Sequence, residues 1–261
     1  MSAVPQSEEI LLREDRDGVC TLTLNRPQQM NLLTSEMLEA LQEAFESLMD
    51  SEVRVVILAA HGKGFCAGHD LKEIRGLREQ PKIEELFGKC SRMMQTIPML
   101  PQPVIARVQG AAAAAGCQLV AQCDLAVASE AAKFTTPGVT WGFFCSTPGV
   151  AVGRNLQRKH AMEMLLTGDV IDARKAMEWG LVNRVVPPEQ LEATTLSLAK
   201  QIAEKPPSTV AAGKRGFYQQ MDMGLAKAYE LASKVIADSF AHDEGRAGMD
   251  AFINKKPPPK T

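Results

Sequence analysis

The alternation of apolar and polar positions near the start of the chain predicts the first three elements. Residues 9–13 and 19–25 alternate with a period of two, and Asp17-Gly18 between them favours a tight turn. From residue 34 to about residue 50 apolar positions recur at helical spacing after a capping threonine. The β-branched run at 53–60 is typical of a strand buried on both faces. The chain is therefore expected to begin with a β-hairpin, a helix and a buried strand.

The middle of the chain alternates between strand and helix patterns. The expected elements are a helix over 83–99, a strand, short helix and second strand within 104–128, a loop over 134–156, helices over 160–168 and 172–180, and a strand over 181–186. Beyond Pro188 the pattern is helical, over 188–204, 207–220, 223–241 and 243–254. This order predicts an α/β core over about residues 1–200 and a helical C-terminal region over 201–261.

Composition narrows the classes of function. The chain has 261 residues, with 29 basic against 31 acidic side chains, so no broad positive field supports nucleic-acid binding. No apolar run reaches the roughly 20 residues of a membrane span, and no targeting segment is visible at the start. The six cysteines form no C-x-x-C pair, which favours reduced thiols. The four histidines lack metal-ligand spacing, so no metal site is predicted.

Residues 104–128, VIARVQGAAAAAGCQLVAQCDLAVA, carry the chemistry that stands out most. The small residues between the first strand and the helix let another backbone come close. The first turn of that helix also presents unpaired N–H groups, which attract negative charge. Plain close packing of a helix on a sheet remains an alternative for this stretch.

Three segments of the chain resemble one family. The stretch just quoted is similar to the signature of the enoyl-CoA hydratase/isomerase (crotonase) superfamily. GKGFCAGHDLKE at 62–73 resembles the family's first oxyanion loop, and residues 160–187 resemble its long helical segment. The likeness extends from about residue 9 to residue 256. It implies a crotonase (ClpP-like) spiral of β-β-α turns with a C-terminal all-α trimerisation region.

The same resemblance implies a substrate, an assembly and a location. The substrate is an acyl-CoA thioester, with coenzyme A as part of the substrate and no separate cofactor. The assembly is a homotrimer or a dimer of trimers, and the location is the mitochondrial matrix. The adenine-pocket segment corresponds to Ala67, Gly68, Asp70, Leu71 and Lys72, and Lys72 with Lys255 or Lys256 would meet the phosphates. A solvated surface lysine is the alternative for each of these.

The family's oxyanion hole consists of two backbone N–H groups, which map to His69 and Ala115. Such donors stabilise the charge that develops on a thioester carbonyl oxygen. Ala115 stands where the family usually has glycine, so its methyl group is expected to narrow the approach and to disfavour a positive φ. The His69 side chain is an alternative candidate for a general base.

Hydration of an enoyl thioester additionally needs two carboxylates. The family positions for these acids hold Gln118 and Gly138, and a third position used by some members holds Ser146. The sequence therefore predicts a thioester-binding protein of lipid metabolism that is weak or inactive as a hydratase. An enzyme that needs only the oxyanion hole, such as a malonyl-type decarboxylase, or one that uses His69 or Cys145, is an alternative. A non-catalytic structural or regulatory oligomer is another.

The glycines at 62–68 leave one further interpretation open. G-x-G-x-x-x-G after a strand resembles a dinucleotide-binding fingerprint. A dinucleotide fold requires that this turn lead at once into an amphipathic helix. Phe65 and Cys66 interrupt the turn here, which argues against a nicotinamide or flavin nucleotide.

Overall fold

A six-stranded sheet forms the centre of the computed structural model, which describes residues 9–257. Its strands, in spatial order, are β1 (Leu11–Arg16), β2 (Val19–Leu24), β3 (Val55–Ala60), β5 (Val104–Val108), β7 (Leu125–Ser129) and β10 (Arg184–Val186). β1 and β2 form the predicted antiparallel hairpin, and every later neighbour is parallel. Residues 1–8, where the sequence shows no targeting segment, lie outside the described residues.

The strands of a second, smaller sheet alternate along the chain with those of the main sheet and have the same spatial order. Its order is β4 (Gly64–Cys66), β6 (Ala111–Ala113), β8 (Lys133–Thr135) and β9 (Ile171–Asp172). β4, β6 and β8 each come a few residues after a strand of the main sheet, and helices follow each pair. This repetition of strand, strand and helix confirms the predicted α/β spiral of β-β-α turns.

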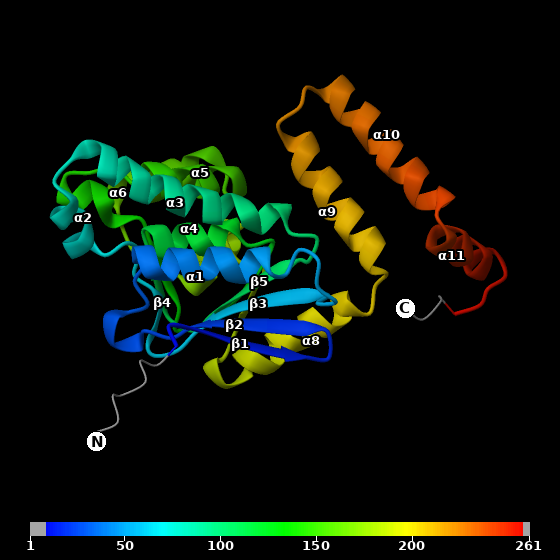
Figure 1. Ribbon diagram of the computed structural model, residues 1–261, viewed down its shortest axis with the longest axis horizontal. Coiled ribbons are helices and arrows are strands. Elements are labelled where there is room, and N and C mark those ends of the chain that lie inside the picture. The colour runs from blue at the N-terminus through cyan, green and yellow to red at the C-terminus, as the bar shows by residue number, and fades with distance from the viewer. Residues whose placement is uncertain (1–8, 258–261) are drawn as a thin grey trace, which may run out of the picture.

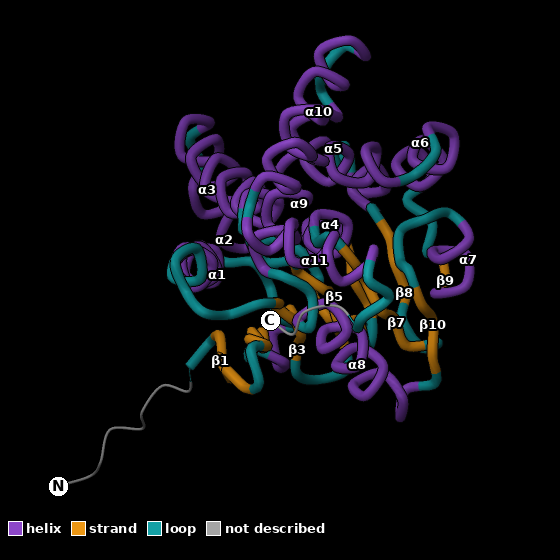
Figure 2. Tube along the Cα trace, turned by 90° about the vertical axis from the view of Figure 1, so that its right-hand side faces the viewer, coloured by secondary structure: helices purple, strands orange, loops and turns teal. Residues whose placement is uncertain are grey.

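Helices cover both faces of the main sheet (Figures 1 and 2). The α-helices of the described residues are α1 (Ser35–Glu46), α2 (Leu71–Leu77), α3 (Gln80–Met99), α4 (Ala115–Gln122), α5 (Ser146–Asn155), α6 (Arg158–Thr167), α7 (Ala173–Glu178), α8 (Leu191–Ala203), α9 (Pro207–Met221), α10 (Leu225–Ala241) and α11 (Asp243–Ile253), of which α10 and α11 do not lie on the sheet. The short 3-10 helices are η1 (Pro27–Gln29), η2 (Pro137–Trp141) and η3 (Pro188–Gln190). In Figure 2, α8 lies below the strands and α4 above them.

The alternation along β3 shows why this strand is apolar throughout. Val55 and Ile57 pack on the face that α8 covers, whereas Val56 and Leu58 point into the larger core beneath α1, α3 and α4. Successive side chains of a strand point to opposite faces, so a strand buried on both sides needs a continuous apolar run.

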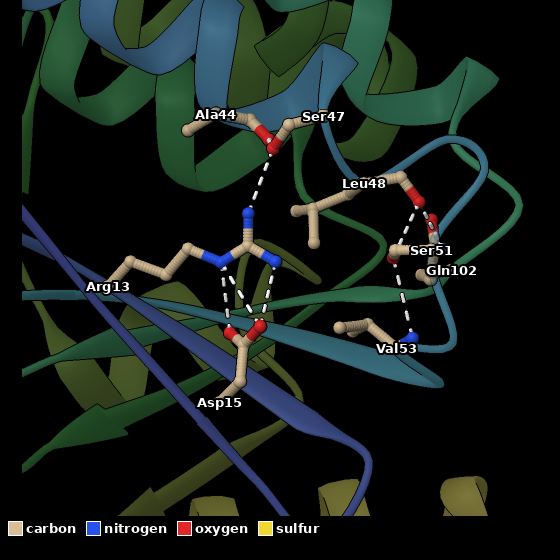
Figure 3. A network of polar contacts seen from close by, with 8 residues as sticks. All are labelled: Arg13, Asp15, Ala44, Ser47, Leu48, Ser51, Val53 and Gln102. Carbon is tan, nitrogen blue, oxygen red and sulfur yellow. Dashed lines mark hydrogen bonds and ion pairs between the residues drawn. The ribbon is translucent and has the colours of Figure 1, made fainter.

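Polar contacts fix the C-terminal end of α1 to the sheet edge (Figure 3). The Arg13 guanidinium donates to the Asp15 carboxylate at 2.7 Å and to the Ser47 hydroxyl at 2.9 Å. On the far side of the same turn, the Gln102 amide donates to the carbonyl oxygen of Leu48 at 2.6 Å. These bonds join β1, α1 and the segment before β5.

Several boundaries differ from the sequence-based prediction, among them that of the first strand, which is expected over 9–13 but runs over Leu11–Arg16. Ala111–Ala113 forms a strand, because it lies between β4 and β8 and its backbone pairs with both. The supposed loop over 134–156 contains β8, η2 and α5, and the strand expected over 181–186 is reduced to Arg184–Val186. α3 begins at Gln80 with Pro81 in its first turn, where proline costs no hydrogen bond.

Of the three C-terminal helices, α9 packs against α3, and α10 and α11 lie farther from the remainder of the chain in Figure 1. They carry large apolar side chains on their surface, including Leu225, Tyr229 and Phe252, which are 75%, 68% and 85% exposed. Within residues 9–257, no helix is both long and apolar enough to cross a membrane.

Candidate functional site

The two segments that the sequence singled out lie against each other at the start of α4. β4 pairs with β6, and α4 begins two residues after β6 ends. A Cβ atom at Gly116 would lie 2.0 Å from the carbonyl oxygen of Cys66, so this approach requires glycine. A Cβ atom at Gly68, where φ is +93°, would lie 3.1 Å from the Ala115 nitrogen. The backbone before His69 and the N–H of Ala115 are therefore close neighbours.

Hydrogen bonds from Asn31 and Leu33, which precede α1, hold the segment that carries His69. The Asn31 side chain is fully buried, and its amide nitrogen donates to the carbonyl oxygens of His61, Gly64 and Phe65 at 2.9, 3.2 and 3.1 Å. The N–H of Leu33 donates to Gly68 at 2.8 Å. Sequence reasoning missed Asn31, although asparagine tolerates its positive φ of 52° better than most residues do.

The start of α4 offers backbone N–H groups to the site. Ala114, not Ala115, has a positive φ, with φ 49° and ψ −118°, and its N–H donates to the carbonyl oxygen of Thr135 at 2.9 Å. Ala115 is already the first helical residue and has no positive φ, so alanine fits the backbone at this position. That its methyl group narrows the approach stays a prediction. No acidic side chain lies in the first turn, so the N-terminal partial charge is free to act on a ligand.

The His69 side chain is held as a neutral imidazole. Its Nδ1 lies 3.2 Å from the carbonyl oxygen of Leu33, and a carbonyl only accepts, so Nδ1 carries the hydrogen. Nε2 is then an acceptor, and it is buried without a hydrogen-bond partner among the described residues. Burial lowers the pKa of this imidazole below its usual value. The ring also meets the edge of Phe87, with centroids 5.0 Å apart.

Gln118 lies one turn after Ala115 and is 4% exposed. Its Oε1 is buried and has no hydrogen-bond partner in the described part of the chain. An amide has no useful pKa, so this side chain can orient a ligand group but cannot take up a proton. The structure thus places Gln118 near the second N–H donor, as its spacing in the sequence implied.

Gly138 lies beneath a loop that leaves no room for a side chain. A Cβ atom there would lie 2.6 Å from the carbonyl oxygen of Phe143 and 2.8 Å from the sulfur of Cys145. The Gly138 N–H donates to that sulfur at 3.3 Å, and its carbonyl accepts from Phe143 at 3.2 Å. A glutamate at this position would require the loop to move.

Neither neighbour of Gly138 in this loop replaces a missing acid. Burial raises the pKa of the Cys145 thiol, so it stays protonated at neutral pH and is a weak nucleophile. Ser146 is exposed, and its hydroxyl donates to the carbonyl oxygen of Phe144 at 3.4 Å. The use of Cys145 as a reactive group therefore has no support from its surroundings.

The segment assigned to coenzyme A forms the entry to α2. The Asp70 carboxylate caps this helix by accepting from the N–H of Lys72 at 2.8 Å, whereas Leu71 and the Lys72 side chain are exposed. α2 and α11, the helix that precedes Lys255 and Lys256, lie at opposite sides of Figure 1. One chain therefore does not bring these lysines to Lys72.

The structure shows the surroundings of three further features of the sequence. The turn after β3 leads into β4, so it lacks the direct strand–turn–helix connection of a dinucleotide site. All six cysteines are buried and free. Over residues 9–257, no cluster of three or more histidine, cysteine, aspartate or glutamate side chains has the geometry to hold a metal ion.

Comparison with known proteins places these features in a family. The model of the family Enoyl-CoA hydratase/isomerase matches residues 14–260. Enoyl-CoA hydratase domain-containing protein 3, mitochondrial, of Mus musculus is 46% identical over 244 residues, which are 93% of this chain and 81% of the relative.

Solved structures agree with the sequence comparison. An enoyl-CoA hydratase of Mycobacterium smegmatis superposes with a TM-score of 0.95 at 48% identity, over 97% of this chain and 99% of its own. Human enoyl Coenzyme A hydratase domain-containing protein 3 does so with a TM-score of 0.93 at 42% identity, over 96% and 100%. With two backbone segments meeting at Ala115 on a spiral of β-β-α turns, the chain belongs to the enoyl-CoA hydratase/isomerase (crotonase) superfamily.

Proposed function

We propose that this chain binds acyl-CoA thioesters in fatty acid and lipid metabolism, and that it hydrates enoyl thioesters weakly or not at all. The packing of Gly138 carries the proposal. Its Cβ position is 2.6 Å from the carbonyl oxygen of Phe143, so the loop occupies the space into which an acidic side chain would extend. Gln118 is the only polar side chain that α4 offers within one turn of Ala115.

The binding chemistry follows from the two backbone donors. The N–H groups of His69 and Ala115 would hold the thioester carbonyl oxygen, and the N-terminal end of α4 adds a favourable partial charge. The segment formed by Ala67, Gly68, Asp70, Leu71 and Lys72 would receive the coenzyme A moiety. Lys72 is exposed at the first turn of α2, where it can reach a phosphate as a point charge.

Decarboxylation of a malonyl-type thioester is the second candidate, because it needs no acid at Gln118 or Gly138. The bond between Cα and the carboxylate breaks, carbon dioxide leaves, and the electron pair forms a thioester enolate that the two N–H groups stabilise. Water then supplies a proton to Cα. The absence of any acidic side chain from the first turn of α4 favours this chemistry, because a fixed negative charge there would oppose the enolate.

Assembly and location complete the proposal. The exposed apolar side chains of α9 to α11 are consistent with a homotrimer or a dimer of trimers. In such an assembly, Lys255 and Lys256 of another copy are candidates to meet the phosphates. We place the protein in the mitochondrial matrix, because relatives at 46% and 44% identity are named mitochondrial.

Titration calorimetry combined with turnover assays tests the proposed function. We expect acetyl-CoA, crotonyl-CoA and malonyl-CoA to bind, and Lys72→Ala to bind more weakly while the exposed control Lys82→Ala does not. Hydration of crotonyl-CoA should remain far below the roughly 1–10³ per second of ordinary enzymes. Turnover in that range would refute the loss of hydratase chemistry, and failure to bind any thioester would leave a structural oligomer. Release of carbon dioxide from malonyl-CoA would establish the decarboxylase instead.

A further inference from the structure

We propose that Glu73 is a positioning residue for the thioester site: by binding the start of α1, it fixes the peptide that carries the His69 N–H. The inference rests on the proposed thioester-binding function and names the side chain that holds one of its two donors in place. It is carried by the contact between α2 and α1. The Glu73 carboxylate accepts from the N–H of Ser35 at 3.2 Å and from the Ser35 hydroxyl at 2.6 Å.

The peptide between Gly68 and His69 is oriented by the segment that precedes α1. The N–H of Leu33 donates to the carbonyl oxygen of Gly68 at 2.8 Å, and Leu33 pairs with His69 as an isolated parallel bridge. The C=O and N–H of a trans peptide point in opposite directions, and no described peptide bond is cis. The His69 N–H therefore points away from Leu33. Its direction depends on how firmly Leu33 and Gly68 are held together.

α2, which follows this peptide directly, has few other attachments to the core. It has seven residues, none of them buried, and a helix this short is not stable by itself. Ile74 and Leu77 are only partly buried where they pack against the core. Within the described part of the chain, Glu73 is the one side chain of α2 that hydrogen-bonds to another element. Glu73 therefore provides the directional attachment of this helix.

The contact between Glu73 and Ser35 is well suited to hold two chain segments in register. Hydrogen bonds to a carboxylate are about twice as strong as neutral ones, and the N-terminal end of α1 also attracts negative charge. The Ser35 bonds and the Leu33–Gly68 bond lie on either side of His69 along the chain. Loss of the Glu73 contact leaves the peptide before His69 fixed from one side only.

Titration calorimetry with acetyl-CoA and with ethyl-CoA, the thioether that lacks the carbonyl oxygen, tests this role. Wild type should bind acetyl-CoA about tenfold more tightly, which corresponds to one or two neutral hydrogen bonds. Glu73→Leu should reduce this preference to about twofold or less. Glu73→Gln keeps an acceptor oxygen for Ser35 and should retain most of the preference. The matched control Glu79→Leu, which removes an exposed ion pair with Lys82, should retain all of it.

Infrared spectroscopy measures the hydrogen bonding of the bound carbonyl group directly. Donors to the carbonyl oxygen lower its stretching frequency, so acetyl-CoA labelled with carbon-13 at that carbonyl reports how well the N–H groups are aimed. The frequency should be lower on wild type and on Glu79→Leu than on Glu73→Leu. If Glu73 only stabilised α2, its loss would weaken both ligands equally and leave the frequency unchanged.

The outcomes separate this inference from the proposed function. Equal binding of acetyl-CoA and ethyl-CoA by wild type, or binding of neither, refutes the thioester site and the inference with it. A wild-type preference that Glu73→Leu retains, with an unchanged carbonyl frequency, overturns the role of Glu73 while thioester binding stands. If Glu73→Leu does not fold, Ser35→Ala removes the hydroxyl bond alone and should lower the preference to about threefold. An unchanged preference in Ser35→Ala then overturns the inference.

Discussion

At the scale of single residues, the packing around Gly138 leaves no room for a Cβ atom and therefore none for an acidic side chain. We expect Gly138→Ala to lower the free energy of unfolding by about 1–3 kcal/mol, because the new methyl group meets the carbonyl oxygen of Phe143. The matched control is Gly153→Ala in α5, where nothing lies within 4 Å of the added Cβ and the change should stabilise by roughly 0.5–1 kcal/mol. Urea unfolding measures both values.

The same contact predicts that restoring the acids will not restore hydration. Gln118→Glu with Gly138→Glu returns both carboxylates, but the second side chain has no space beneath Phe143 and Cys145. We expect crotonyl-CoA hydration by the double variant to stay at the wild-type level in a coupled spectrophotometric assay. The obstacle is steric, since Gly138 is not among the positive-φ glycines and backbone conformation would not exclude glutamate. A large gain in rate would show that the loop moves readily.

His69 should make stability depend on pH. Burial depresses its folded-state pKa below 6.5, so between these two pKa values the unfolded chain binds more protons than the folded one. The contribution of neutral His69 to the free energy of unfolding is therefore complete above pH 6.5, and it is lost as the pH falls toward the folded-state pKa. We expect His69→Gln to show a smaller loss of unfolding free energy between pH 7.5 and pH 5 than wild type. The exposed His61→Gln should behave as wild type does.

At the scale of elements, one buried polar cluster holds α9 against the core. The Lys214 ammonium donates to Asp124 at 2.7 Å and to the carbonyl oxygens of Ile97 and Gln102 at 2.9 Å each. The hydroxyl of Tyr218 donates to the same carboxylate at 2.8 Å. Burial raises the pKa of this tyrosine, so it remains a donor at neutral pH.

Removing the lysine should loosen the C-terminal helices before the core unfolds. Lys214→Met leaves Asp124 without its cation, and breaking a buried pair in this way typically costs about 3–5 kcal/mol. We expect faster amide hydrogen exchange in α9 to α11 and earlier proteolysis there. The control Lys234→Met removes an exposed pair with Glu230 and should cost under about 0.5 kcal/mol. Equal exchange in the two variants would contradict a tethering role.

At the scale of the whole molecule, the outer surface of α10 and α11 predicts self-association. Leu225 and Phe252 are 75% and 85% exposed, and burying such side chains against another copy is favourable by roughly 25 cal/mol per Å². We expect wild type to scatter light as a trimer or hexamer. The double variant Leu225→Glu, Phe252→Glu should shift it toward the monomer, whereas Lys227→Glu on the same helix should not. A monomeric wild type at micromolar concentration would refute the prediction.

The sequence by itself determined the elements whose cause is local. The period of two in the hairpin, the apolar run of β3 and the threonine that caps α1 each depend on neighbouring residues. Each predicted element formed, although β1 runs over Leu11–Arg16 and not over 9–13. The absence of acids at positions 118 and 138 is likewise a property of the sequence, as are the motifs that indicated the superfamily.

Tertiary contacts decided the features that join distant segments. Ala111–Ala113 has no β-branched side chain, yet it is a strand, because β4 and β8 supply its hydrogen bonds. Asn31 hydrogen-bonds to the backbone of the segment before His69, and the loop after Gly142 packs against Gly138. Tertiary contacts also left Oε1 of Gln118 buried without a hydrogen-bond partner among the described residues. Whether a buried group has a partner depends on every segment folded around it, and a pattern along one segment carries no record of the others.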